Sequence, residues 1–507
     1  EDGGQSLIKN SRLAGTFTAK YNFFESLNLQ AVYGAVLTNS RTRSYQRILR
    51  VYDPTDLDRV AVESQDNFLN INNEGDQLHN LNLLLNYAKE FGDHNITFLA
   101  GGSREWFETQ NDFVGTRDFL TDNIFTISAG SSNPAFWNIS GGASDWALQS
   151  VFSRLHYSFK DKYLFKTAFR YDGSSRFTED LRWGFFPSVS AGWIVSQEGF
   201  LLNNNVLTFL KLRGSWGQVG NQNVGFYPFA NRLSQGAYYF NGVPQRAVAT
   251  AGAANPLLTW ETKEALNLGI EGSIYQNILE FSVDLFHEKT HDILLQLPLP
   301  TTFGQAEPVQ NAGRVDNRGW EVELRHRNTI GDFGYGISFQ LSDATNKVID
   351  MGGISPRISG DVITEEGRPM NEWYGLQADG FFQSDTEVQN HAFQDAQTSA
   401  GDIRYIDQNN DNVIDSDDRV RLGRSDPRFP FGFRVNLNYK SFYLSAFGQG
   451  IMKHQVISRP WEASGAVDTY RTYHLDYWTP ENPDARFPQP RLGSGPLVGI
   501  NKEFSSF

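Results

Sequence analysis

Polar and apolar residues alternate with a period of two along most of this chain. In the segment 433–440, FRVNLNYK, the apolar side chains fall on one side and the Arg, Asn and Lys side chains fall on the other. The same alternation recurs at 163–171, 279–285, 320–327 and 333–341. A side-chain period of two is typical of a β-strand with one apolar and one polar face. The pattern therefore predicts an all-β fold.

The alternation predicts about fourteen strands of about 11–15 residues each, well above the usual ~5–6. These strands are residues 11–22, 27–40, 78–89, 94–107, 146–159, 163–173, 184–196, 206–217, 261–273, 278–291, 312–327, 332–345, 430–440 and 442–453. Short and long connections alternate strictly. The short ones lie near 23–26, 90–93, 160–162, 274–277, 328–331 and 440–441, and the long ones span roughly 41–77, 109–144, 218–260, 292–311 and 346–429.

Strands of this length can cross a bilayer at a tilt. We interpret the pattern as an antiparallel transmembrane β-barrel with short periplasmic turns and long extracellular loops. Aromatic residues at strand ends, such as Tyr163, Tyr171 and Trp183, fit the girdles at the two membrane surfaces. A soluble β-sandwich would bury the same apolar faces in a core, so the alternation alone leaves that alternative open. A propeller is not favoured, because no sequence repeat of about 40–50 residues is present.

The composition agrees with a β-rich protein of the cell envelope. Of the 507 residues, 46 are Gly, 14% are aromatic and none is Cys. The lack of Cys excludes a disulfide framework, a zinc–thiolate site and a cysteine nucleophile. The formal net charge of −14 argues against nucleic acid as a partner. No apolar run approaches the ~18 residues of a transmembrane helix, and the strands of a membrane barrel need no such run.

The acidic segment 407–418 has the ligand spacing of a calcium loop. Its candidate ligands are Asp407, Asn409, Asp411, the Val413 carbonyl, Asp415 and Asp418. Asn412 stands where an EF-hand has Gly, and the last ligand is Asp instead of the longer Glu. We predict a structural Ca²⁺ here; the alternative is an acidic loop of Asx turns. The loop belongs to the joint 346–429, which is predicted to begin and end outside the cell.

The segment 287–291, HEKTH, matches the H-E-x-x-H signature of zinc proteases. That chemistry requires a helix, which brings both His residues onto one face. Here the segment ends the predicted strand 278–291, where residues four apart are separated by roughly 13 Å. Two His residues so far apart cannot share a zinc ion at ~2.0–2.1 Å per bond. We therefore interpret the segment as a strand end and predict no enzymatic activity.

Aromatic residues in the predicted loops are candidates for contact with a substrate or with a partner protein. They include Trp137, Tyr238, Tyr239, Trp373, Tyr374 and Trp461. The alternative is that each ring packs against its own loop. On the polar strand faces, Glu321, Glu323, Arg325 and Arg327 are predicted to form ion pairs along the wall of the lumen.

Several segments, in this order along the chain, resemble the SusC/RagA-type TonB-dependent outer-membrane transporters of Bacteroidota. They are YLFKTAFRYDGSSRF at 163–177, WGFFPSVSAGWIVSQEGFL at 183–201, FLKLRGSWGQVGNQ at 209–222, NPLLTWETKEALNLGIE at 255–271, HDILLQLPLP at 291–300, NAGRVDNRGWEVEL at 311–324 and GDIRYIDQNNDNVIDSDDRVRLGRSDPRFPFGF at 401–433. The resemblance implies the outer membrane of a Gram-negative, Bacteroidota-like cell. It also implies a 22-stranded barrel with a plug, a SusD-like surface lipoprotein as partner, and import of an oligosaccharide or peptide powered by the TonB–ExbB–ExbD complex.

The chain departs from that plan in two ways. No plug precedes Glu1, and about fourteen strands are fewer than the resemblance implies, so we expect residues 1–507 to be the barrel portion of a longer transporter. Its non-protein contacts are then expected to be membrane lipid and a glycan or peptide cargo. Two alternatives stay open: a secreted or surface glycan-binding adhesin with a calcium-stapled loop, and a siderophore or cobalamin receptor of the same architecture.

Overall fold

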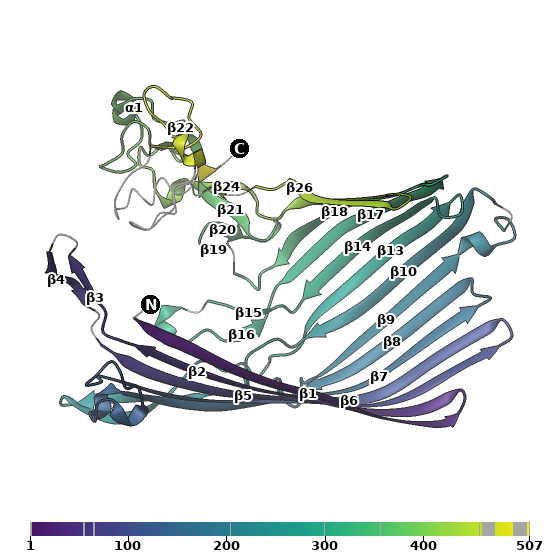
Figure 1. The fold of residues 1–507 in the computed structure, drawn as a ribbon, viewed down its shortest axis with the longest axis horizontal. Helices are drawn as coiled ribbons and strands as arrows, with labels where there is room; N and C mark the ends of the chain where they lie inside the picture. Colours follow the sequence, from purple (N-terminus) through teal and green to yellow (C-terminus); the bar gives the residue numbers. More distant parts are fainter. Residues whose placement is uncertain are drawn as a thin grey trace. The chain divides into compact units, whose positions relative to one another are not determined.

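The computed structural model of the chain describes residues 3–53, 56–63, 66–202, 204–298, 300–354, 356–455, 457–458, 472–489 and 504–505. Fourteen long strands are assigned to one sheet, in which they follow the order of the sequence (Figure 1). The number and order of the strands confirm the prediction from the alternation. Among the described residues, no helix has the length and apolar character needed to cross a membrane.

The chain forms two compact units, which comprise residues 1–192, 215–262 and 294–311 in the first and 193–214, 263–293 and 312–507 in the second. The long strands of the first unit are β1 (Gly4–Phe24), β2 (Leu27–Gln46), β5 (Phe68–Phe91), β6 (His94–Arg117), β7 (Trp137–Phe159), β8 (Tyr163–Ser174) and β9 (Trp183–Ile194). Those that lie mainly in the second unit are β10 (Leu207–Asn221), β13 (Glu261–Ile274), β14 (Leu279–His291), β17 (Arg314–Ile330), β18 (Phe333–Asp350), β25 (Arg428–Tyr439) and β26 (Phe442–Lys453).

Several strands extend further toward the long loops than the sequence pattern predicted. β5 begins at Phe68, where residue 78 was expected, and β6 continues to Arg117. In the added part of β5, polar side chains such as Asn73 and Glu74 fall on both faces, so the apolar period is lost. The backbone pairing with β6 nevertheless continues without a shift along the whole strand. Backbone pairing needs no apolar face, which is why the pattern underestimated these strands.

The turns opposite the long loops are short, as predicted. Lys160 and Asp161 between β7 and β8 have φ values of 54° and 51°, the conformation of a tight hairpin turn. The connection 195–206 between β9 and β10 is longer and contains the 3₁₀ turn η3 (Val195–Gln197), whose Val195 is buried. The predicted strict alternation of short and long connections is therefore wrong at this position. The connection is long enough to form a 3₁₀ turn and to bury the side chain of Val195.

The loops contain smaller elements. Paired short strands are β3 (Arg50–Asp53) with β4 (Asp56–Glu63), β11 (Leu233–Phe240) with β12 (Val243–Thr250), β15 (Leu294–Gln296) with β16 (Val309–Asn311), β22 (Ala378–Phe381) with β23 (Ile403–Tyr405), and β27 (Ile457–Ser458) with β28 (Phe504–Ser505). A four-stranded sheet joins β19 (Arg357–Ser359), β20 (Val362–Thr364), β21 (Glu372–Leu376) and β24 (Arg419–Arg424). The helical pieces are α1 (Asp385–Asn390), η1 (Ile127–Ala129), η2 (Pro134–Phe136), η4 (Thr301–Phe303), η5 (Ser416–Asp418) and η6 (Thr472–Leu475).

The buried hydrophobic clusters of the described residues are built from loops and outer strand ends. Apolar residues in the middle of the long strands are exposed instead: Leu83 is 51% exposed, Phe169 43% and Leu285 55%. A β-sandwich would cover these residues with a second sheet. The sandwich alternative is therefore wrong for this chain.

Candidate functional site

The long strands present one apolar and one polar face. Across β14 and β17, Val283 pairs with Val322, and the next pair, Asp284 with Glu321, points to the other side. On β18 the apolar side runs from Phe333 to Leu341, and its register with β25 keeps apolar residues on the same face. This run is about 30 Å long, or about 23 Å at a tilt of ~40°, which matches the apolar band of a membrane barrel. We call the apolar side the outer face and the polar side the inner face.

Aromatic rings mark both edges of this band in the first unit. At the edge near the long loops, Tyr33, His79 and Trp106 stack across β2, β5 and β6, with ring centroids 6.1 and 5.0 Å apart. At the opposite edge, Phe159 stacks on Tyr163 at 6.3 Å. Rings at the ends of an apolar band are the girdles of an outer-membrane barrel. The stack of Tyr171 on Trp183 at 4.9 Å agrees with the predicted girdle positions.

On the inner face of the second unit, Arg213 of β10 connects three strands. Its guanidinium donates to Glu271 of β13 and to Asp284 of β14, both at 2.7 Å. A third hydrogen bond goes to Asn267 Oδ1 at 3.0 Å. A Cβ on Gly269 would lie 2.7 Å from Arg213 Cζ, so glycine leaves the room that the guanidinium occupies. These charge-assisted bonds fix a polar patch on the inner wall.

Beside the Arg213 cluster, the inner face lines a trough of about 660 Å³ between β14 and β26. Its carboxylates are Asp284, Glu321 and Glu323. The predicted pairing along the wall is confirmed for Arg325, which contacts Glu323 at 2.6 Å, and for Arg327, which contacts Glu280 of β14 at 2.8 Å. Glu321 has no ion-pair partner in the described part of the chain. The trough therefore offers hydrogen-bond acceptors to a polar molecule in the lumen.

The outer loops of the first unit close over a hydrophobic cluster that we call the loop core. It consists of Phe177, Phe186, Val224, Leu258 and Trp260, each at most 7% exposed. The indole nitrogen of Trp260 donates to the carbonyl of Arg182 at 2.8 Å, which joins two loops.

Hydrogen bonds complete the loop core. Asn311 bridges to both backbone groups of Thr259, at 2.7 and 2.8 Å. The Tyr227 hydroxyl donates to Asp145 at 2.6 Å, and this bond raises the pKa of Tyr227 to about 12. Tyr227 holds a φ of 50°, a conformation that a bulky residue adopts only when its surroundings impose it. Several loops are thus held in one arrangement.

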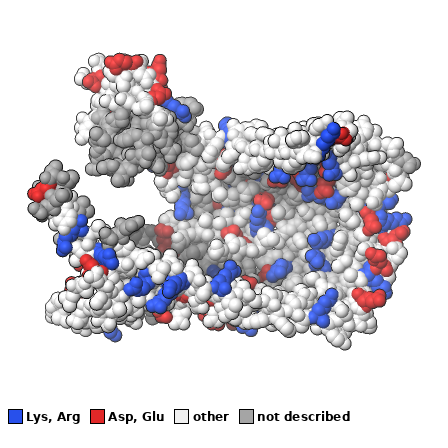
Figure 2. Space-filling model, viewed as in Figure 1, with Lys and Arg blue, Asp and Glu red and all other residues white. Residues whose placement is uncertain are grey.

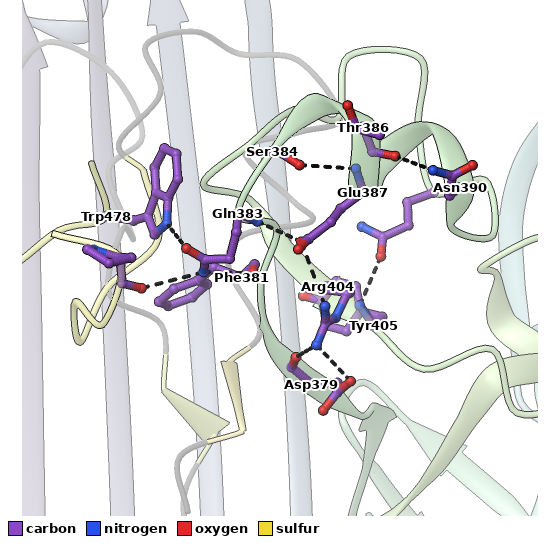
Figure 3. A network of polar contacts seen from close by, with 12 residues as sticks. Asp379, Phe381, Gln383, Ser384, Thr386, Glu387, Asn390, Arg404, Tyr405 and Trp478 are labelled. Atoms are coloured by element: carbon purple, nitrogen blue, oxygen red, sulfur yellow. Dashed lines mark hydrogen bonds and ion pairs between the residues drawn. The ribbon is translucent and has the colours of Figure 1, made fainter. Parts of the chain in front are cut away.

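The long joint 346–429 and the later segment 472–489 share a small core. It consists of Ala378, Phe381, Ile403, Tyr405, Ile414, Trp478 and Ala485. Figure 3 shows the polar network beside it. Arg404 contacts Asp379 at 3.0 Å and Glu387 at 3.8 Å, and Gln383 accepts a hydrogen bond from the Trp478 indole at 3.1 Å. The short strands β21 and β22 of this region belong to two of the small sheets.

The segment 407–418 forms a loop whose carboxylates accept backbone hydrogen bonds. Asp407 accepts from the amides of Asn410 and Asn412 at 2.7 and 2.9 Å. Asp418 is fully buried and accepts from Gln408 and Asp415 at 2.7 and 2.9 Å.

The other candidate ligands of this loop are bonded locally. Asn409 and Asp411 accept from the amides two residues ahead, as does Asp415. Asn412 has a φ of 68°, so Asn takes the left-handed conformation at the position where an EF-hand has Gly. Among the described residues, no three His, Cys, Asp or Glu side chains are grouped as metal ligands. In this arrangement the loop holds itself together, and calcium binding stays a prediction.

The predicted loop aromatics have different environments. The indole nitrogens of Trp137 and Trp373 donate to backbone carbonyls at 2.8 and 2.7 Å, so both rings brace the chain. Tyr374 lies under Arg419, 4.9 Å from its guanidinium carbon. Tyr238 and Tyr239 are 60% and 66% exposed on the β11–β12 hairpin and are free for contact with another molecule. Trp461 lies outside the described residues.

The H-E-x-x-H segment ends the strand β14, as predicted. His287 contacts Asp316 at 3.4 Å, whereas His291 contacts Asp292 at 2.9 Å. Glu288 pairs with Lys263 at 2.9 Å. The two His residues thus have separate partners, and the zinc-protease interpretation is excluded.

The sequence reasoning missed the Arg213 cluster and the loop core. Arg213 lies 58 residues before Glu271 and 71 residues before Asp284 in the sequence, so spacing gave no sign of their contact. The one available signal was Gly269 within an otherwise regular strand, because a strand glycine often marks a close approach of another group.

Long tilted strands with an exposed apolar band, aromatic girdles and a charged inner wall define an integral outer-membrane β-barrel protein. The family model described as "TonB dependent receptor-like, beta-barrel" matches residues 2–444, and the chain belongs to this family. Its members are receptors and transporters of the outer membrane and not enzymes. The chain is therefore a portion of such a barrel.

The chain is similar to "TonB-dependent receptor P26" of Formosa agariphila, with 32% identity over 433 residues that cover 82% of this chain and 43% of that protein. It is 27% identical to "TonB-dependent receptor SusC" of Bacteroides thetaiotaomicron over 374 residues, which cover 72% of this chain and 36% of SusC. Among solved structures, the RagAB peptide transporter shares the fold, with a TM-score of 0.80 and 21% identity over 98% of this chain and 54% of that one. The chain thus spans about half the length of the curated relatives it matches.

Proposed function

We propose that this chain is the barrel portion of a TonB-dependent transporter that imports an oligosaccharide or a peptide across the outer membrane. The observation that carries the proposal is the polar inner wall, where the Arg213 cluster borders a trough rich in acceptors. A nutrient with hydroxyl or amide groups would exchange its bonds to water for bonds to this wall. The relative named SusC and the fold shared with the RagAB peptide transporter support the same class of function.

The partners follow from the same proposal. A SusD-like lipoprotein would cover the outer loops, where the exposed Tyr238 and Tyr239 offer aromatic contact area. Energy would come from the TonB–ExbB–ExbD complex through a part of the protein other than the barrel wall. The barrel itself would bind and guide its cargo without changing it chemically.

Uptake in cells tests this function. A strain without the complete receptor gene would be compared with a complemented strain for uptake of labelled oligosaccharides and labelled peptides. We expect uptake of one of the two classes to fall to background, and the same loss when ExbB is deleted. Uptake of the corresponding free monosaccharide or amino acid should be unaffected, because small solutes need no dedicated transporter. Unchanged uptake of both oligomer classes would contradict the proposal.

We also propose a structural Ca²⁺ in the loop 407–418. The ligand spacing and the left-handed Asn412 support it. The carboxylates would have to exchange their bonds to backbone amides for bonds to the ion, so binding would rearrange the loop. Weak binding would suffice, because extracellular modules work at millimolar calcium.

A further inference from the structure

The outer face of the first unit contains a polar trough beyond the aromatic girdle. The β-sheet register places Lys9, Arg41, Asn73 and Asp112 in one row across β1, β2, β5 and β6. The adjacent row, one step nearer the membrane, contains Ser11, Asn39, Gly75 and Gln110. These side chains line a trough of about 570 Å³.

The register also fixes the depth of the trough. His79 and Trp106 of the girdle face the same side as Gly75 and Gln110, four residues further along β5 and β6. Four residues correspond to about 13 Å along a strand and about 10 Å along the membrane normal. The trough therefore begins at the depth of the lipid headgroups, directly above the hydrocarbon. Gly75 leaves the middle of the trough open, because it has no side chain. A Cβ at this position would meet only Asn39 Oδ1, at 3.4 Å.

The two cations and three of the amide side chains of the trough are not used by the protein. In the described part of the chain, the side chains of Lys9 and Arg41 have neither an ion-pair nor a hydrogen-bond partner. The same holds for the amide groups of Asn73, Gln77 and Gln110. Figure 2 shows Lys and Arg side chains gathered over β1 and β2. On the opposite face of the same strands, by contrast, Ser40 and Asn10 bond to each other at 2.8 Å.

We propose that this trough binds the headgroup of an outer-leaflet glycolipid, a phosphorylated sugar. Lys9 and Arg41 bind a phosphate, which accepts several charge-assisted hydrogen bonds. The amides of Asn73, Gln77 and Gln110 both donate and accept, as sugar hydroxyl groups require. Asp112 on β6 repels a phosphate, so the phosphate lies over β1 and β2 and the sugar over β5 and β6. The acyl chains continue along the apolar band below.

Lipid retention by the complete receptor tests the site. The protein is purified in detergent, and bound lipid A carrying two phosphates is quantified by native mass spectrometry. We expect the Lys9→Gln/Arg41→Gln double variant to retain this lipid more than about tenfold less tightly, because each charge-assisted hydrogen bond is worth about a factor of ten or more. Gly75→Tyr keeps both cations but fills the trough, so it should weaken retention as well.

The matched control is Arg12→Gln/Lys20→Gln, which removes the same charge from the opposite face of β1 and should retain the lipid like the wild type. Heat-modifiable gel mobility confirms that each variant is folded. Equal retention by all four proteins overturns the site, as does equal retention of dephosphorylated lipid A, which would point to the acyl chains alone. Displacement of the lipid by inorganic phosphate would assign the trough to a free anion and overturn the lipid.

Discussion

The loop core of the first unit and the acidic loop 407–418 of the second both close long outer connections, but by different forces. The loop core buries Phe177 and Leu258 completely and joins several loops through Trp260. The acidic loop is held mainly by carboxylate bonds to its own backbone, with Ile414 as its apolar anchor. The stability gained from buried rings depends little on pH and salt, whereas the strength of hydrogen bonds to carboxylates depends on both. The difference separates a fixed scaffold from an adjustable loop.

The largest effect is expected for Trp260→Ala. Removing this 6% exposed ring deletes the centre of the loop core and the bond to Arg182, at a cost of about 3–5 kcal/mol to the local opening free energy. Hydrogen exchange of the segment 222–260 would measure the loss. The control is Leu257→Ala, in the same segment and 76% exposed, which should change it by less than about 0.5 kcal/mol. Similar protection in both variants would show that the loops do not depend on this core.

A smaller effect is expected for Asp418→Asn. The amide substituent directs N–H groups at one of the backbone donors, Gln408 or Asp415, that the carboxylate accepts. A buried backbone group then loses its partner, which costs about 1–3 kcal/mol. Faster exchange of these two amides in calcium-free buffer is the measurement. Asp417→Asn is the control, because Asp417 is exposed on the same turn. No difference between the two would contradict the self-supported loop.

Calcium should act on the acidic loop 407–418 and not on the loop core. If the loop 407–418 takes up the ion, millimolar Ca²⁺ should slow its proteolysis several-fold, while the loop core is unaffected. Asp407→Ala combined with Asp411→Ala should abolish the protection, because both candidate ligands are lost. The same cleavage rate with calcium and with chelator would leave the Asx-turn description as the complete account of this loop.

The smallest effect concerns the hydroxyl of Tyr227. Its bond to Asp145 raises the pKa from the ordinary 10.0 to about 12, so the folded loop keeps the proton that an open loop releases. The stabilisation is therefore complete below pH 10 and is lost as the pH rises through about 12. Limited proteolysis of the segment 222–232 across this range should show the opening. Tyr227→Phe should remove the step, and an unchanged step would assign it to another group.

The sequence predicted the membrane-crossing part of the fold well, because lipid on one side and polar groups on the other force a period of two. All fourteen long strands follow from that requirement. The pattern did not predict strand residues where both faces of the sheet are exposed to water. Asn73 and Glu74, for example, lie in an unbroken strand that shows no apolar period. It also missed contacts that arise only from folding. The indole of Trp260 bonds to the carbonyl of Arg182 at the loop core, and the spacing of these residues in the sequence does not predict this contact.

The length of β5 has a consequence for how a molecule approaches this protein. The strand has 24 residues, whereas about 9–11 suffice to cross a bilayer. Because the turn at its inner end is short, the surplus stands on the outer side, on the order of 30 Å above the lipid at a tilt of ~40°. The outer end of the wall on this side therefore extends well beyond the membrane surface. A bulky polymer in the surrounding medium meets protein first, at a distance from the crowded membrane surface.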